Sequence, residues 1–119
     1  MKKELMTTAA IALGLSLAAS AQTFESRRSA EGDRLFTSEK IEQVIDEVTS
    51  QLTNPKLAWM FRNCFPNTLD TTVHYRDDKD GNPDTFVYTG DIHAMWLRDS
   101  GAQVWPYVQF ADRDEHLRR

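Results

Sequence analysis

Five apolar residues limit the folds open to the stretch 38–52, because they are spaced like one face of an α-helix. They are Ile41, Val44, Ile45, Val48 and Leu52. Steps of three and four residues bring them to the same side of a helix, and Thr37 or Ser38 can cap its first turn. The apolar face continues for only about two heptads, which is too short for a coiled coil. The sequence therefore predicts an amphipathic helix that buries one face against another part of its own protein.

A second helix follows after a short break. Asn54 is a good N-cap, and Pro55 is tolerated at the first helical position because its missing N–H needs no partner there. Apolar residues continue to Cys64, and Pro66 is expected to end the helix. Two helices joined by so short a loop form a hairpin whose apolar side needs a further surface to cover it.

The hydrophobic period then changes from helical to alternating. Stretches 71–75 and 85–88 are rich in β-branched and aromatic residues, and they flank the polar stretch 77–83. Asp80-Gly81 is a favoured turn pair, so this part predicts a β-hairpin. Helical character returns over 99–112, where Pro106 is expected to kink the helix or to restrict its start.

The acidic turn of this hairpin does not match a calcium loop. With Gly81 at position six, Arg76 stands at position one and Val87 at position twelve, where acidic ligands are required. The three histidines, at 74, 93 and 116, have no ligand spacing either. We therefore expect no metal site and no cofactor.

The N-terminus is typical of an exported protein. Lys2 and Lys3 precede an uncharged apolar run over 7–18, and Ala19-Ser20-Ala21 offers small residues to a signal peptidase. We predict a signal peptide over 1–21, Sec-dependent export to the periplasm or the extracellular space, and no stable membrane span after cleavage. A membrane anchor or a buried N-terminal helix is the other interpretation of the apolar run.

The residues after the cleavage site begin with a polar stretch without periodicity. We predict a flexible leader over 22–37 that leads into a domain portion over 38–119. Cleavage removes two of 14 basic and one of 18 acidic residues, which leaves a net charge of −5. An acidic chain without a basic stripe is not expected to bind nucleic acid. Its abrupt helix-like ending at 115–119 indicates a piece of a longer domain.

Cys64 is the single cysteine of the sequence, so no disulfide can form within the chain. Bulky apolar neighbours on both sides favour a buried, inert thiol. Pairing with a cysteine in a downstream part of the protein is the alternative.

The segment 89–100 carries the residues suited to chemistry. Trp96, Arg98 and Asp99 combine an aromatic plate, a cation and a carboxylate within four residues, which suits the apolar faces and hydroxyls of a sugar. Asp91 is a fourth candidate. Two structural interpretations remain open, since Asp99-Ser100 can cap the next helix and Arg98 with Asp99 can form a plain ion pair.

Three stretches resemble glycoside hydrolase family 125. They are Asn63-Cys64-Phe65-Pro66-Asn67-Thr68-Leu69-Asp70-Thr71-Thr72-Val73, Thr85-Phe86-Val87-Tyr88-Thr89-Gly90-Asp91-Ile92, and Ala94-Met95-Trp96-Leu97-Arg98-Asp99-Ser100 with the residues that follow to Tyr107. The resemblance covers roughly 38–119. His93 stands where proline is usual in the family and Gly101 where threonine is common, which affects local loop shape rather than charge.

The resemblance implies a mainly α fold, namely the N-terminal part of an (α/α)6 barrel with a small β-hairpin before the sugar-binding segment. It implies a metal-independent, inverting exo-α-mannosidase that prefers α-1,6 linkages in mannose-containing glycans. Asp91, Trp96, Arg98 and Asp99 would bind sugar at the −1 subsite. Asp70 is either a further binding residue or a structural cap, and we favour the cap. The acid and base, which inversion separates by about 6.5–9.5 Å, are expected outside 1–119. A non-catalytic sugar-binding relative, or an incomplete gene fragment without activity, remains an alternative.

Overall fold

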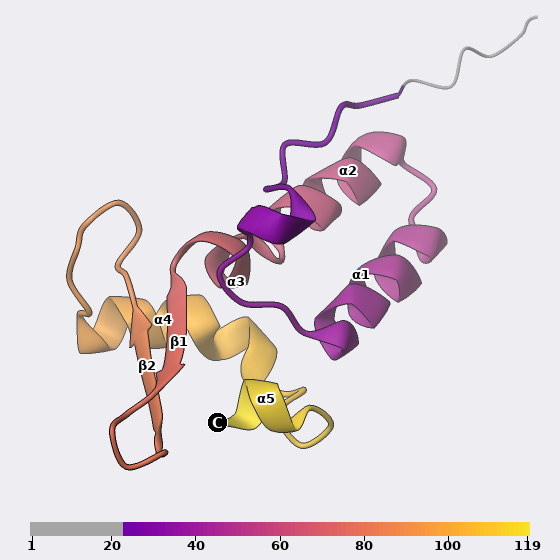
Figure 1. The fold of residues 1–119 in the computed structure, drawn as a ribbon. Coiled ribbons are helices and arrows are strands. Elements are labelled where there is room, and N and C mark those ends of the chain that lie inside the picture. Colours follow the sequence, from indigo (N-terminus) through magenta and orange to yellow (C-terminus); the bar gives the residue numbers. More distant parts are fainter. Residues whose placement is uncertain (1–22) are drawn as a thin grey trace, which may run out of the picture.

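The computed structural model describes residues 23–119, so the predicted signal peptide lies outside the described residues. The described part is mainly helical with one two-stranded antiparallel sheet (Figure 1). Its elements in chain order are η1 (Glu31–Asp33), α1 (Glu39–Gln51), α2 (Pro55–Cys64), α3 (Asn67–Thr71), β1 (Val73–Asp77), β2 (Pro83–Val87), α4 (Leu97–Val108) and α5 (Glu115–Arg118).

Helices α1 and α2 form the predicted helical hairpin (Figure 1). The Ser38 hydroxyl accepts a hydrogen bond from the Ile41 N–H at 3.2 Å and so caps α1. Asn54 Oδ1 accepts from the Lys56 N–H at 2.9 Å and caps α2. Three residues of the predicted apolar face of α1, namely Ile41, Val44 and Ile45, are buried, whereas Val48 and Leu52 are only partly buried. Both helix starts are therefore confirmed, and the buried face is confirmed for its first three residues.

Helix α3 was not predicted, because its threonines indicated a strand. The Thr71 hydroxyl donates to the Asn67 carbonyl and the Thr72 hydroxyl donates to the Thr68 carbonyl, both at 2.7 Å. Such bonds to the carbonyl four residues earlier are compatible with a helix, although they stabilise it poorly. The strand consequently starts at Val73, two residues later than the sequence pattern predicted.

Strands β1 and β2 form the predicted hairpin, in which Val73 pairs with Val87. These two valines point into the core, with exposed fractions of 4% and 5%. In the turn, Asp78 Oδ1 accepts hydrogen bonds from the backbone N–H groups of Asp80 and Asn82, both at 2.8 Å. Gly81 has a φ of 81°, which glycine adopts without strain. The acidic stretch therefore closes a turn.

The described part of the predicted flexible leader, 23–37, is fixed against the helices. The N–H groups of Leu35 and Phe36 donate to the carbonyls of Asp70 and Leu69 at 3.0 and 3.2 Å. The Phe36 side chain is 5% exposed and belongs to the core. The local composition indicated flexibility because it does not reveal these carbonyl partners, which lie more than thirty residues further along the chain.

Arg28 anchors this leader through two carboxylates. Its Nε and Nη2 donate to both oxygens of Asp70 at 2.6 and 3.0 Å, and Nη1 and Nη2 donate to Glu42 at 2.8 and 2.6 Å. These bonds raise the pKa of Arg28 well above its ordinary range and lower the pKa of Glu42, although partial burial opposes both shifts. Asp70 is therefore an ion-pair partner rather than the cap that we expected.

Helix α4 begins two residues earlier than predicted and ends at Val108, and α5 is a separate short helix. Pro106 lies within α4, close to its end. The buried Tyr107 hydroxyl donates to the Phe65 carbonyl, which ties α4 to the end of α2. The Ser38 hydroxyl donates to Asp114 Oδ2 at 2.5 Å, which ties α5 to the start of α1.

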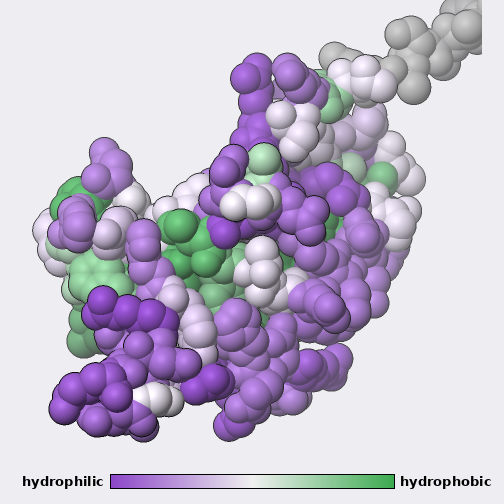
Figure 2. Space-filling model, in the orientation of Figure 1, coloured by the Kyte–Doolittle hydropathy of each residue, from purple (hydrophilic) through white to green (hydrophobic). Residues whose placement is uncertain are grey.

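One core unites these elements. It contains Phe36, Ile41, Ile45, Leu69, Val73, Val87 and Tyr107. Apolar surface also reaches solvent near the centre of the face shown in Figure 2, and polar residues surround it. Within residues 23–119, no helix has the length and apolar character needed to cross a membrane.

The apolar side of the helical hairpin is not covered by the described residues. An open hollow of about 530 Å³ lies on α1 and α2. It is lined by Val48, Leu52, Leu57, Met60, Phe61, Cys64 and Phe65. Cys64 is exposed there, so the prediction of a buried thiol is wrong for the described part of the protein.

Candidate functional site

The candidate site is the loop that leaves β2 at Val87 and enters α4 at Leu97. Gly90 has a φ of 60°, which lets the chain reverse direction directly after the strand. The Thr89 N–H donates to the Ala94 carbonyl at 2.8 Å, and the Ile92 N–H donates to the Thr89 carbonyl at 3.1 Å. The loop is therefore closed by its own backbone hydrogen bonds and not only by its two ends.

Two hydroxyl side chains attach this loop to the strand and to the helix. Thr89 Oγ1 accepts a hydrogen bond from the Trp96 N–H at 3.2 Å. Ser100 Oγ lies 3.3 Å from Thr89 Oγ1 and donates to the Val87 carbonyl at 2.8 Å. Ser100 is only 2% exposed. These contacts hold the last residue of the loop at a fixed place beside the end of β2.

Three of the four predicted sugar-binding residues lie at the start of α4. Trp96 occupies the N-cap position and is 51% exposed. The Arg98 side chain is 88% exposed, and its Nη2 lies 3.3 Å from Oδ2 of Asp99, a half-buried side chain in the first turn. Asp99 and Ser100 do not cap the helix, since Trp96 holds that position without a side-chain cap.

The exposed positions of these side chains bear on the structural interpretation. An exposed ion pair between neighbouring residues contributes about 0–1 kcal/mol to stability, and the Arg98–Asp99 pair is of this kind. The Trp96 indole also remains half open to solvent. Stability therefore gives little reason for this trio, whereas an accessible indole, guanidinium and carboxylate can bind a polar ligand with an apolar face.

Asp91 lies in the same loop, exposed to solvent. Within residues 23–119, no hydrogen bond or ion pair joins it to Trp96, Arg98 or Asp99. The structure thus brings Arg98 and Asp99 into contact and places Trp96 beside them in the chain, whereas Asp91, on the other arm of the loop, is bonded to none of the three.

Sequence reasoning assigned no role to several side chains around this loop. His93 Nε2 lies 3.1 Å from the Tyr88 hydroxyl, and the Tyr88 ring packs 4.3 Å from the His74 ring, measured between centroids. Thr89 and Ser100 were part of the family resemblance but were not recognised as attachment points. Their signal is weak, because threonine and serine are common in loops and their contact depends on the fold.

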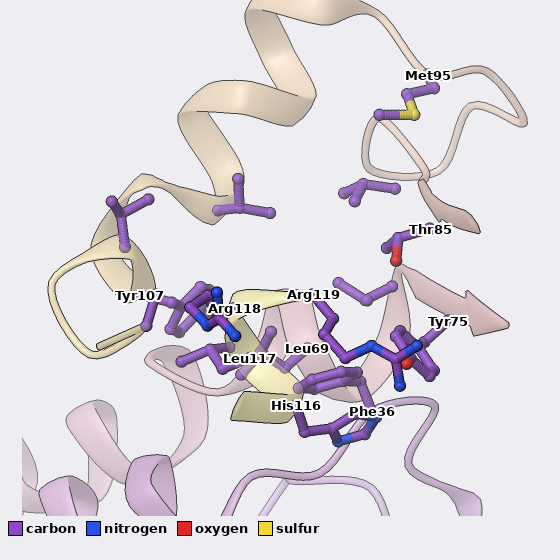
Figure 3. Close-up of a pocket in the computed structure, with 15 residues that line it drawn as sticks. Phe36, Leu69, Tyr75, Thr85, Met95, Tyr107, His116, Leu117, Arg118 and Arg119 are labelled. Carbon is purple, nitrogen blue, oxygen red and sulfur yellow. The ribbon is translucent and has the colours of Figure 1, made fainter. Parts of the chain in front are cut away.

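A cavity lined largely by core residues is shown in Figure 3. It measures about 420 Å³ and lies between the β-hairpin, α4 and α5. Its walls are mainly apolar and include Phe36, Tyr75, Tyr107 and Leu117. Of the candidate segment, Met95 reaches its rim, but none of the four predicted sugar-binding residues lines it.

Over residues 23–119, no group of three or more histidine, cysteine or acidic side chains is placed to hold a metal ion. Four carboxyl groups have a clearly shifted pKa, and each shift is downward: Glu42, Asp78, Asp114 and Glu115. A general acid in glycoside hydrolysis needs a raised pKa instead. None of these four has the property required of that acid.

Comparison with known proteins places the chain among glycoside hydrolases. The sequence model of the family described as metal-independent alpha-mannosidase (GH125) matches residues 54–119, which include the whole candidate loop. The chain is also 46% identical over 91 residues to the meiotically up-regulated gene 157 protein of Schizosaccharomyces pombe. That match covers 76% of this chain and 18% of the yeast protein, so the chain spans less than a fifth of this relative.

Proposed function

The chain belongs to the GH125 family of metal-independent alpha-mannosidases, and on this basis we propose that it is the N-terminal part of an inverting exo-α-mannosidase. The complete protein would remove terminal α-1,6-linked mannose from glycans. The proposed fold of the complete domain is an (α/α)6 barrel, to which the mainly helical elements described here would contribute the first helices and the hairpin.

The observation that carries the proposal is the exposed trio at the start of α4. Trp96 offers an indole face for a sugar ring, while Arg98 and Asp99 offer a donor fork and an acceptor for its hydroxyls. These side chains lie within the region that the family model matches. We propose that they form part of the −1 subsite, together with Asp91 from the other arm of the loop.

The catalytic acid and base are proposed to lie in the remainder of the complete protein. The relative is more than five times as long as its match to this chain, which leaves ample room for both carboxylates. An inverting enzyme uses one protonated carboxylic acid and one carboxylate, with a water between the carboxylate and the sugar. Residues 23–119 would then bind and orient the terminal mannose without exchanging a proton with it.

Export is also part of the proposal. The basic residues at positions 2 and 3, the apolar run and the small residues at 19–21 motivate Sec-dependent secretion to the periplasm or beyond. Glycans with terminal mannose would be met there. N-terminal sequencing of the mature protein should begin at Gln22, and a mature protein that retains residues 1–21 would contradict this part of the proposal.

The test is hydrolysis of α-1,6-mannobiose by the complete protein, with NMR detection of the first anomer released. We expect β-mannose, as inversion requires, and no loss of activity with chelators. Arg98→Ala should raise KM by about tenfold to a hundredfold, since a charged hydrogen bond contributes about 1.5–3 kcal/mol. Arg113→Ala is the matched control, because Arg113 forms a similar exposed pair with its neighbour Asp112 at 3.9 Å.

The outcomes separate the candidate functions. Release of α-mannose would exclude inversion, and activity unaffected by both arginine substitutions would remove Arg98 from the subsite. Calorimetric binding of mannose without any hydrolysis would instead identify a non-catalytic sugar-binding relative. If the complete protein neither binds nor hydrolyses the mannose substrate, the proposed function is refuted.

A further inference from the structure

The donor and the acceptor in each hydrogen bond around Thr89 can be assigned, because each hydroxyl has only one proton to donate. The Val87 carbonyl can only accept, so Ser100 must donate its single hydroxyl proton to it, at 2.8 Å. Because the Ser100 hydroxyl proton is used in that bond, Ser100 Oγ can only accept a hydrogen bond from Thr89 Oγ1, which lies 3.3 Å away. The Thr89 hydroxyl donates in turn, and its oxygen is then free to accept the Trp96 N–H at 3.2 Å.

The result is a one-way chain of hydrogen bonds from Trp96 through Thr89 and Ser100 to Val87. Each hydroxyl both accepts and donates, and each such bond polarises the next. The Ser100 N–H also donates to the Trp96 carbonyl at 2.8 Å. Trp96 is therefore held at its N–H and at its carbonyl, and both bonds lead to the same serine.

This closed arrangement fixes the backbone from which the candidate sugar-binding side chains project. Trp96 is the N-cap of α4, and Arg98 and Asp99 lie in the first turn behind it. The first turn can point elsewhere only if the buried Ser100, which is 2% exposed, loses its partners. A displacement of about 1 Å in a binding group can reduce activity about a hundredfold.

We propose that Thr89 and Ser100 are positioning residues for mannose binding, which they support by holding Trp96 and the first turn of α4 in place. Neither side chain is proposed to touch the sugar. The inference rests on the proposed function for its catalytic consequence, whereas the chain of hydrogen bonds stands on the geometry alone.

The experiment uses the complete protein with three substitutions. Thr89→Val has nearly the shape of threonine but removes the hydroxyl, and Thr89→Ser retains the hydroxyl as a rescue. Thr72→Val is the control at a threonine outside this chain of hydrogen bonds, because Thr72 is buried and its hydroxyl donates to the Thr68 carbonyl at 2.7 Å. For each protein, KM and kcat on α-1,6-mannobiose, the thermal midpoint and the hydrogen exchange of the Trp96 amide are measured.

We expect Thr89→Val to raise KM about tenfold or more, Thr89→Ser to stay within about twofold of the wild type, and Thr72→Val to lower the thermal midpoint without changing KM. The Trp96 amide should exchange faster in Thr89→Val than in the other two variants. Equal KM values for Thr89→Val and Thr72→Val would overturn the inference.

If the wild-type complete protein neither binds nor hydrolyses mannose, the proposed function is refuted, and with it the expected effect on KM. The amide exchange would still decide whether Thr89 holds Trp96. Unchanged Trp96 exchange in Thr89→Val would overturn the positioning role itself, whatever the substrate. The two failures are therefore distinguishable.

Discussion

Replacement of Arg28 by methionine should release the leader from the helices. The substitution preserves most of the aliphatic stem but removes the guanidinium that binds both oxygens of Asp70. Asp70 is 2% exposed and Arg28 is 9% exposed, so the variant leaves a buried carboxylate without its main partner. Breaking such a buried pair costs about 3–5 kcal/mol.

The neighbouring charges set the expected value within this range. Arg34 Nε lies 4.0 Å from Asp70 Oδ1 and can compensate in part, which favours the lower end, about 3 kcal/mol. The bonds from Arg28 to Glu42 add little, because Glu42 is 40% exposed and a pair at the surface contributes about 0–1 kcal/mol. Glu42→Gln is therefore the matched control, with an expected loss below about 1 kcal/mol.

Hydrogen exchange of the Leu35 and Phe36 amides measures this loss in the complete protein. Both amides donate to carbonyls of α3, at Asp70 and Leu69, so they exchange when the leader detaches. A loss of about 3 kcal/mol should reduce their protection about a hundredfold in Arg28→Met. Protection should stay within about fivefold in Glu42→Gln.

Restoration by a second substitution provides the stricter check. Arg28→Met combined with Asp70→Leu removes the unpaired carboxylate and should recover most of the protection, as apolar replacement of a buried pair often does. Equal protection in Arg28→Met and Glu42→Gln would refute the argument, because it would mean that burial of Asp70 has no energetic consequence.

Three further predictions concern stability. The pKa of Glu42 lies below its ordinary value of 4.5 because Arg28 donates hydrogen bonds to it, so its contribution to stability is present above pH 4.5 and is lost as the pH falls below that value. The free energy of unfolding should therefore fall less steeply with decreasing pH in Glu42→Gln than in the wild type. An equal slope would contradict this. Gly90→Ala should lower the free energy of unfolding, measured in urea, by about 1–2 kcal/mol, because φ is 60° at this position. Gly101→Ala within α4 should raise it by about 0.5–1 kcal/mol, because the added Cβ meets no atom within 4 Å. Effects of the same sign would refute the backbone argument. Tyr107→Phe should cost about 1 kcal/mol in the same assay, because it removes the hydroxyl bond to the Phe65 carbonyl, and a neutral result would contradict that role.

Local rules predicted the elements whose determinants lie close together in the sequence. The caps at Ser38 and Asn54 each bond to a residue two or three positions later, so the sequence contains both partners side by side. The β-turn is similar, since Gly81 supplies the positive φ and Asp78 bonds to the next few N–H groups. The candidate trio was also visible, because its three side chains lie within four residues.

The elements that sequence reasoning missed depend on distant partners. The leader is ordered by Asp70, which lies 42 residues beyond Arg28. Helix α3 was missed because β-branched threonines favour strands in general, while here their hydroxyls bond to carbonyls of the same turn. Cys64 was expected inside because its neighbours are bulky, but a helix buries only one face, and Cys64 lies on the face that the described residues leave open.

The candidate segment combines two groups of residues with opposite demands on solvent. Arg98 is 88% exposed and can reach a ligand, whereas Ser100, two positions later, is 2% exposed and is satisfied within the fold. The hydroxyl chain needs every partner, because a buried hydroxyl such as that of Ser100 costs about 1–3 kcal/mol when it is left unpaired. Substitutions of the exposed group should therefore change affinity one contact at a time, whereas removal of either hydroxyl should disturb Trp96 and the first turn of α4 together.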